Sequence, residues 1–215
     1  MNIIEGIIKI LEVIGRLSEV HEELKNNSQQ RNIIEILLRF LRSHISSDLN
    51  GHAFRCLAQL ISQPDTSLAD RLWTRLEDEQ TLFTWRQNNE PIDKGIELDF
   101  LEKYQTEERT RCPATVGFCY LLSALLRTTK LPHELGLARR GQKPPGIHLH
   151  MEYVSKLLLR NWPKRNFDDF HEKWELAGLC LEIFEIVLEK ENPLEFRPMP
   201  STINNFGYFI FIIFF

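Results

Sequence analysis

The stretch from residue 167 to residue 190, FDDFHEKWELAGLCLEIFEIVLEK, limits the possible fold more than any other part of the chain. Apolar residues recur in it at alternating steps of three and four, the spacing of one face of a helix. This first stripe consists of Phe167, Phe170, Trp174, Ala177, Leu181, Phe184 and Leu188. A second stripe beside it consists of Leu176, Cys180, Ile183 and Val187. So wide an apolar face must be covered on two sides, which predicts a helix inside a helical stack.

Burial of one large apolar side chain contributes roughly 1.5–3 kcal/mol, so the first stripe is predicted to anchor this helix against a neighbour. Acidic residues lie opposite the apolar stripes: Asp168, Glu172, Glu175, Glu182, Glu185 and Glu189. We interpret them as a solvated helix face, and docking of a basic partner is the alternative.

Helical periodicity also dominates the rest of the chain, while strand signals are almost absent before residue 206. Further helices are predicted at residues 3–24, 33–45, 49–61, 66–76, 95–110, 116–126 and 148–162. Thr115 is a candidate N-cap for the helix at 116–126. A polar loop is predicted around residues 87–91, and three prolines and three glycines make 128–147 the longest irregular segment.

Successive helices with broad apolar faces and short connections predict an all-α fold, an irregular α-solenoid of stacked helical hairpins. A compact helical bundle is the structural alternative. Residues 1–204 are predicted to form a single segment of this kind. Residues 205–215 are a separate apolar tail, which either docks on the domain or, as we favour, indicates an incomplete piece of a longer chain.

Composition excludes several classes of protein. The chain is 43% hydrophobic and 26% charged, as in ordinary globular proteins, and its net charge of −4 is unlike that of a strongly basic nucleic-acid binder. The first fifteen residues are apolar, but charges at helical spacing and the lack of a basic start argue against a signal peptide. The run FGYFIFIIFF at 206–215 is shorter than the roughly 20 residues of a membrane span.

No arrangement of residues predicts catalysis or a cofactor. His148 and His150 with Glu152 could be offered as metal ligands, but residues two apart on a helix point in different directions, so a cap or loop role is favoured for both histidines. Cys112 and Cys119 could react only if exposed beside a base. Cys119 is predicted to lie in the core. The sequence therefore predicts no catalytic, cofactor-binding or metal-binding residues.

The four cysteines, which also include Cys56 and Cys180, contain no CxxC pair and are predicted to be reduced thiols. The 128–147 segment is basic because it contains Lys130, Arg139, Arg140 and Lys143. Its basic residues could bind an acidic segment or merely keep the loop soluble, and the sequence favours neither interpretation.

Four stretches in a fixed order carry a resemblance to a known family. They are LWTRLEDEQ at 72–80, GIELDFLEKYQTEERTRCPATVGFCYLLSALL at 95–126, the loop ending KPPG at 143–146, and the final helix with KWE at 173–175 and LEIF at 181–184. In this order they resemble the family of the two-hundred-and-five-kilodalton inner-ring scaffold nucleoporin of the nuclear pore complex. The resemblance covers roughly Leu68 to Glu191.

The resemblance implies an α-helical solenoid without catalysis, located in the pores of the nuclear envelope in the nucleus. It implies other nucleoporins as partners, both inner-ring members and linkers that thread short motifs into grooves. It implies no small-molecule substrate, no direct nucleic-acid contact and no transmembrane span. No binding residue is assigned, because the matching motifs look like internal packing. The main alternative is an α-helical-repeat adaptor unrelated to the pore, and an enzyme is disfavoured.

Overall fold

The computed structural model describes residues 28–42, 47–61, 66–78, 84–85, 91–92, 111–135, 146–160, 162–164 and 167–191. Most of these residues are helical, which confirms the all-α prediction for the described part of the chain. The α-helices are α3 (Ser28–Arg42), α4 (Ser47–Ile61), α5 (Thr66–Asp78), α7 (Pro113–Thr128), α8 (His148–Glu152) and α9 (Phe170–Lys190). A π-helix, η1 (Tyr153–Leu159), and a 3-10 turn, η2 (Trp162–Lys164), lie between α8 and α9.

The predicted positions of α4, α5, α7 and α9 agree with the structure to within about three residues. α3 begins five residues before the predicted start at 33, and it ends at residue 42 rather than 45. The predicted N-cap is wrong, since α7 begins at Pro113 and Thr115 is buried inside it. Proline suits the first turn of a helix because its missing N–H would have no partner there. The helices predicted at 3–24 and 95–110 lie outside the described residues.

Two very short strands depart from the prediction that strand signals are almost absent before residue 206, and the polar loop predicted around residues 87–91 lies mostly outside the described residues. β1 (Thr84–Trp85) and β2 (Pro91–Ile92) pair in antiparallel register, with Thr84 opposite Ile92. Each strand has two residues, which is too short for the alternation of apolar and polar residues that identifies longer strands.

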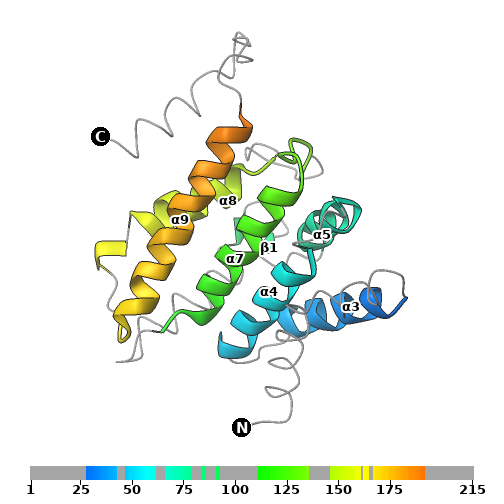
Figure 1. The fold of residues 1–215 in the computed structure, drawn as a ribbon, viewed down its shortest axis with the longest axis horizontal. Helices are drawn as coiled ribbons and strands as arrows, with labels where there is room; N and C mark the ends of the chain where they lie inside the picture. Colours follow the sequence, from blue (N-terminus) through cyan, green and yellow to red (C-terminus); the bar gives the residue numbers. More distant parts are fainter. Residues whose placement is uncertain are drawn as a thin grey trace.

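α4 and α7 lie side by side and run in the same direction (Figure 1). At the start of both helices, the Arg111 guanidinium lies 3.8 Å from the Asp48 carboxylate. At their ends, the Thr128 hydroxyl donates to the Ile61 carbonyl at 3.3 Å. Because the starts meet each other and the ends meet each other, the pair is parallel.

Two glycines bring the backbones of α4 and α7 into direct contact. A Cβ placed on Gly117 would lie 2.4 Å from the carbonyl oxygen of Gly51 and 2.8 Å from its Cα. A Cβ placed on Gly51 would lie 2.4 Å from the carbonyl oxygen of Pro113. Real Cβ atoms do not approach backbone so closely, so this contact requires glycine on both helices.

α9 is the third helix of the parallel row, beside α7 (Figure 1). At the start of both helices, Glu172 accepts a hydrogen bond from the backbone N–H of Cys112. At their ends, the Lys190 ammonium donates to the Leu126 carbonyl. The order α4, α7, α9 therefore places three parallel helices next to one another.

An aromatic cluster connects this row to α5, α8 and η1. The Trp73 indole on α5 donates to the Thr129 hydroxyl at 3.1 Å, and its ring meets that of His150 edge-on at 5.3 Å. The Phe118 ring on α7 lies 5.8 Å from the Tyr153 ring on η1. These buried contacts join helices on both sides of α7 into one core.

The predicted helix at 148–162 is present, but it is not a uniform α-helix. It changes from α8 to the wider η1, and the Arg160 N–H donates to the Ser155 carbonyl at 2.9 Å. The wider turns bury Tyr153, Val154, Ser155 and Leu158. π-helical turns are rare and occur as short segments inside α-helices, so the helical pattern of the sequence did not indicate this change.

Candidate interaction surface

α9 begins where a capping side chain satisfies its first turn. The Asp169 carboxylate accepts from the His171 backbone N–H at 2.7 Å, and Asp169 itself is extended. An aspartate at this position supplies the acceptor that the first helical N–H groups lack. The helix therefore starts at Phe170, three residues after the predicted start at Phe167.

Glu172 is the first residue of α9 that faces α7, and it is only 9% exposed. Its Oε1 atom accepts from the Cys112 N–H at 3.0 Å, so a side chain of α9 caps the first turn of α7. Burial raises the pKa of Glu172, while the Cys112 hydrogen bond and the charge of Arg111 partly offset that rise. Among the described residues, no group forms a hydrogen bond with its buried Oε2 atom.

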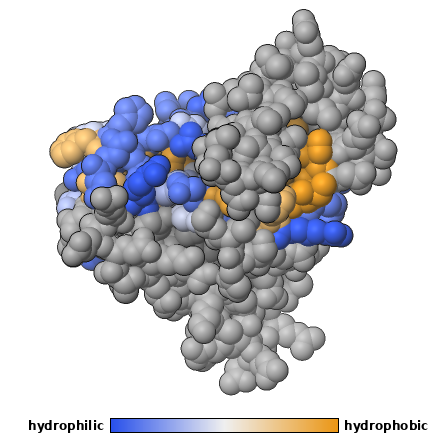
Figure 2. Space-filling view, turned by 90° about the horizontal axis from the view of Figure 1, so that it is seen from below, coloured by the Kyte–Doolittle hydropathy of each residue, from blue (hydrophilic) through white to orange (hydrophobic). Residues whose placement is uncertain are grey.

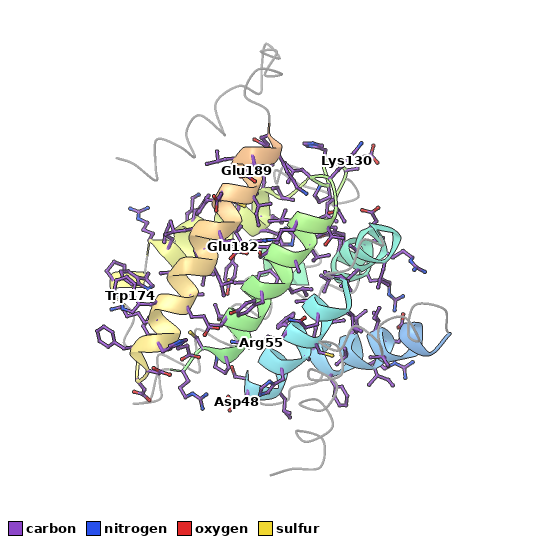
Figure 3. All side chains as sticks on the ribbon, viewed as in Figure 1. Asp48, Arg55, Lys130, Trp174, Glu182 and Glu189 are labelled. Carbon is purple, nitrogen blue, oxygen red and sulfur yellow. The ribbon has the colours of Figure 1, made fainter. Side chains whose placement is uncertain are left out.

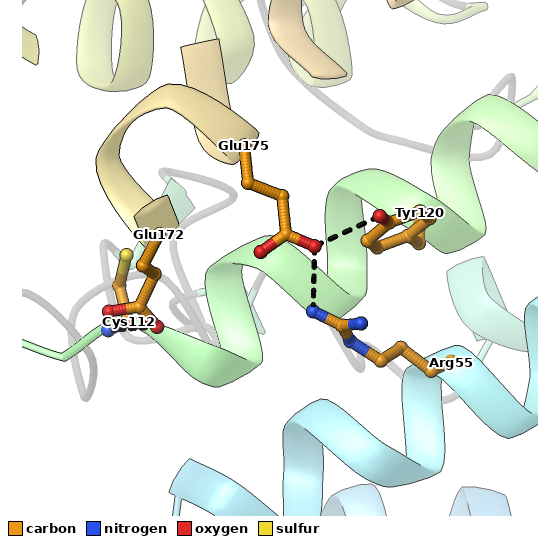
Figure 4. Close-up of polar contacts among 5 residues, drawn as sticks. All are labelled: Arg55, Cys112, Tyr120, Glu172 and Glu175. Carbon is orange, nitrogen blue, oxygen red and sulfur yellow. Dashed lines mark hydrogen bonds and ion pairs between the residues drawn. The ribbon is translucent and has the colours of Figure 1, made fainter. Parts of the chain in front are cut away.

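Glu175 joins all three helices of the row (Figure 4). Its Oε1 atom accepts from the Tyr120 hydroxyl at 2.9 Å and from the Arg55 guanidinium at 3.1 Å. The guanidinium also lies over the Tyr120 ring, 4.6 Å from its centroid. Burial, and next the Glu175 carboxylate, raise the pKa of Tyr120.

Glu182 and Lys190 complete the polar contacts between α7 and α9. Glu182 accepts from the Ser123 hydroxyl and, at 2.8 Å, from the Arg127 guanidinium. Lys190 donates to carbonyls at the end of α7, those of Leu126, Arg127 and Thr129. A cation at this end complements the negative pole of the helix dipole.

We call Glu172, Glu175, Glu182 and Lys190 the polar seam. Glu172 and Lys190 are separated by about 27 Å along α9 at 1.5 Å per residue, close to the length of about 24 Å of α7. The two residues can therefore cap both ends of α7. The prediction that the acidic residues of α9 form a solvated face is wrong for the three glutamates of the seam. Asp168, Glu185 and Glu189 are exposed, as predicted.

Tyr120→Phe tests how much the Glu175 contact contributes. We expect it to lower the free energy of unfolding by about 1 kcal/mol, because the variant loses one part-buried hydrogen bond but keeps the ring under Arg55. Urea unfolding followed by circular dichroism measures this loss. In a Glu175→Ala background the same substitution should have almost no effect, and an equal loss in both backgrounds would rule out the contact.

The first stripe of α9 is largely on the surface, which corrects the prediction that it anchors the helix. Phe170 is 70% exposed, Trp174 59%, Leu181 58% and Leu188 48%, and we call these four residues the outer stripe. The second stripe is buried, as are Leu179, between Glu175 and Glu182, and Ile186, between Glu182 and Lys190. α9 is thus apolar over most of its circumference, and the glutamates of the seam, rather than the first stripe, contact α7.

Aromatic rings gather at the beginning of the outer stripe. Trp174 meets Trp162 of η2 edge-on, with ring centroids 5.0 Å apart. The Lys173 ammonium lies 4.8 Å from the centroid of Trp162 and 5.8 Å from that of Phe170. In Figure 3, Trp174 projects from α9 on the side away from α7, whereas Glu182 lies toward α7. Exposed tryptophans with an apolar surround are typical of protein interaction sites.

Apolar surface is also present at the other side of the row. Ile36 on α3 is 48% exposed. The view from below shows apolar surface of the described residues at two separate places among hydrophilic side chains (Figure 2). The outer stripe contains four of the five large apolar side chains that are exposed in the described part of the chain.

The histidines of the HLHME segment lie inside a helix, so the prediction of a cap or loop role is wrong for His150. His150 is 2% exposed and its ring stacks at 6.5 Å on that of Phe118. Glu152 forms an ion pair with Lys156 at 2.9 Å. His148 is half-buried, and burial lowers its pKa. His150 therefore packs in the core, whereas Glu152 forms its ion pair with Lys156 at the surface.

The remaining candidate residues lie mostly in the core. All four cysteines are described, and each is a buried thiol outside any disulfide. Cys119 is fully buried on α7, as predicted. Of the basic loop residues, Lys130 is exposed, while Arg139, Arg140 and Lys143 lie outside the described residues. Within the described ranges, no three metal-ligating side chains converge and no helix is long and apolar enough to span a bilayer.

Comparison with known proteins agrees with the resemblance seen in the sequence. Residues 1–196 match the family described as nuclear pore complex scaffold, nucleoporins 186/192/205. Human nuclear pore complex protein Nup205 is 29% identical to the chain over 163 residues, which cover 74% of the chain and 8% of the human protein. The chain thus spans less than a tenth of the length of this relative. Because the family match covers most of its residues, the chain belongs to the nucleoporin 186/192/205 family, whose members are scaffold components of the nuclear pore complex at the nuclear envelope.

Proposed function

We propose that the chain is a non-catalytic segment of an α-solenoid in the inner ring of the nuclear pore, where it supports pore assembly and nucleocytoplasmic transport. The family membership supports a scaffold role. The parallel row α4, α7 and α9, with α5 and α8–η1 packed against it, supports the solenoid arrangement. In a solenoid, each unit contacts mainly its neighbours, and equivalent helices of successive units lie side by side.

The direct contact of α4 and α7 is the observation that carries this proposal. Gly51 and Gly117 let α4 and α7 approach backbone to backbone. The polar seam then fixes α9 in the same orientation beside α7. A segment of this kind resists bending, because both ends of the middle helix are held by the next helix along.

The partners in this proposal are other nucleoporins, both inner-ring members and linkers. A tagged full chain, incubated with nuclear-envelope extract, should recover inner-ring or linker nucleoporins identified by mass spectrometry. Gly117→Ala should abolish this recovery because it separates α4 from α7. Gly178→Ala is the matched control, since no other helix of the described residues comes within 4 Å of the position of its Cβ.

Two results would contradict the pore assignment. A folded, helical chain that recovers no nucleoporin would favour the unrelated helical-repeat adaptor. Equal recovery by the wild type and an unfolded Gly117→Ala variant would mean that capture does not depend on the fold. Nuclear-rim fluorescence of a tagged chain provides an independent readout of location.

A further inference from the structure

We propose that the end of α7 forms a binding site for a primary ammonium group, which Lys190 fills as a ligand tethered to α9. The Lys190 ammonium donates to three backbone carbonyls, which belong to Leu126, Arg127 and Thr129. An ammonium group has three N–H donors and no acceptor, so three acceptors around one point satisfy it completely. This inference does not rest on the proposed scaffold function.

The acceptors of this site are dipoles of the backbone rather than charged groups. Among the described residues, every hydrogen bond that the Lys190 ammonium donates ends on a backbone carbonyl. The Leu126 and Arg127 carbonyls belong to the last turn of α7, where a helix has no N–H of its own to offer them, and they form the negative pole of its dipole. Converging backbone carbonyls also bind monovalent cations in channel filters, where they replace the hydration shell of the ion.

The carbonyls of the site are held by contacts that do not involve the lysine. The N–H and the hydroxyl of Thr129 both donate to the Leu125 carbonyl, at 3.0 Å and 2.9 Å. The Trp73 indole on α5 donates to the same hydroxyl at 3.1 Å. Beside it, the Thr128 hydroxyl donates to the Ile61 carbonyl of α4 at 3.3 Å. The site is therefore preorganised, and it should persist when its own ligand is removed.

The site is open to solvent on the side from which the lysine enters. Leu126 is fully buried and Thr129 is 3% exposed, whereas Lys190 at the end of α9 is an exposed residue (Figure 3). Hydrogen bonds to partly desolvated carbonyls are stronger than the same bonds in water. A small cation should therefore reach the carbonyls, and be held by them, once the lysine side chain is shortened.

Lys190→Ala in the full chain empties the site, and methylammonium chloride supplies the missing group. Hydrogen exchange of the Thr129 N–H, followed by NMR, is a local readout because this N–H closes the last turn of α7. We expect exchange to be about tenfold faster in the variant than in the wild type, as for the net loss of about one hydrogen bond. Methylammonium at saturation should return it to within about twofold of the wild type.

A matched salt and a matched variant control this rescue. Tetramethylammonium chloride has the same charge but no N–H donor, so it should not slow exchange in Lys190→Ala. Lys156→Ala removes an exposed lysine whose ammonium pairs with Glu152 at 2.9 Å instead of with carbonyls. Exchange of the Thr129 N–H in this variant should equal that of the wild type in either salt.

Lys190→Arg tests the shape of the site. Arginine keeps the positive charge, but the donors of its planar guanidinium are spread over a fork and do not converge on one point. We therefore expect exchange of the Thr129 N–H to remain faster than in the wild type. Wild-type exchange in this variant would mean that the end of α7 needs only a charge, which would overturn its selectivity for a primary ammonium group.

Unchanged exchange in Lys190→Ala would overturn the proposal, because the carbonyls would then not depend on their ligand. Recovery that is equal in the two salts would also overturn it, as would no recovery in methylammonium. None of these results bears on the recovery of nucleoporins, so the ammonium site and the scaffold function can fail separately.

Discussion

Gly117→Ala is expected to lower the free energy of unfolding by about 3 kcal/mol, near the upper end of the usual range for overpacking. The new methyl group would lie 2.4 Å from the Gly51 carbonyl oxygen and 2.8 Å from its Cα. Both are backbone atoms that no rotamer change can move, so α4 and α7 must separate. Their separation would also strain the Thr128 hydrogen bond to Ile61.

Gly178→Ala provides the control for the intrinsic effect of the substitution. It places the same methyl group inside a helix at a position that no other described helix approaches within 4 Å. We expect it to raise the free energy of unfolding by about 0.5–1 kcal/mol, since alanine favours the helix. Urea unfolding followed by circular dichroism measures both changes. Equal stability of the wild type and Gly117→Ala would disprove the backbone contact.

The helices themselves could be predicted well from the sequence. Their apolar periodicity is strong, and Pro113 and Asp169 mark the starts of α7 and α9. Which residues face which neighbour could not be predicted as well. Apolar residues surround most of α9, so the apolar pattern alone allows several orientations.

Glu172 and Trp174 illustrate the error in the predicted orientation. A glutamate is usually exposed and a tryptophan usually buried. Here Glu172 is buried because the first turn of α7 has N–H groups that need acceptors, whereas Trp174 is on the surface. Partners of this kind lie 60 residues away in the sequence, and a single sequence contains no signal that connects them.

The two glycines of the α4–α7 contact were also missed, although a signal was present. Gly51 and Gly117 each occur inside an otherwise apolar helical pattern, where glycine is unfavourable. Such glycines often mark close helix packing. In the sequence, however, Gly178 carries the same signal. Only the structure shows that Gly51 and Gly117 contact another helix and that no other described helix approaches Gly178.

Glu172→Ala and Glu172→Gln should have opposite consequences at neutral pH. Alanine removes the acceptor for the Cys112 N–H and leaves a buried donor unsatisfied, so we expect a loss of about 2 kcal/mol in the free energy of unfolding. Glutamine keeps an amide oxygen at the same place and removes the buried charge. We therefore expect Glu172→Gln to be at least as stable as the wild type.

The pH dependence of the free energy of unfolding tests the buried Glu172 carboxyl group more directly. Burial raises the pKa of Glu172 above its ordinary value of 4.5, so the folded chain holds this proton more tightly than the unfolded chain does. Its contribution to stability is therefore complete below about pH 4.5 and is lost as the pH rises through the folded pKa. The Glu172→Gln variant lacks this loss, and its advantage over the wild type should grow from pH 4 to pH 7.

Glu185→Gln is the matched control on the same helix, because Glu185 is exposed. Its stability relative to the wild type should stay nearly constant over that range. Urea midpoints measured by circular dichroism at several pH values compare the three proteins. If the advantage of Glu172→Gln were constant or fell with rising pH, the carboxylate would be solvated and could not cap α7 from within the core. If it grows while Glu172→Ala is unstable throughout, then α9 holds the start of α7 through a hydrogen-bond acceptor rather than through charge.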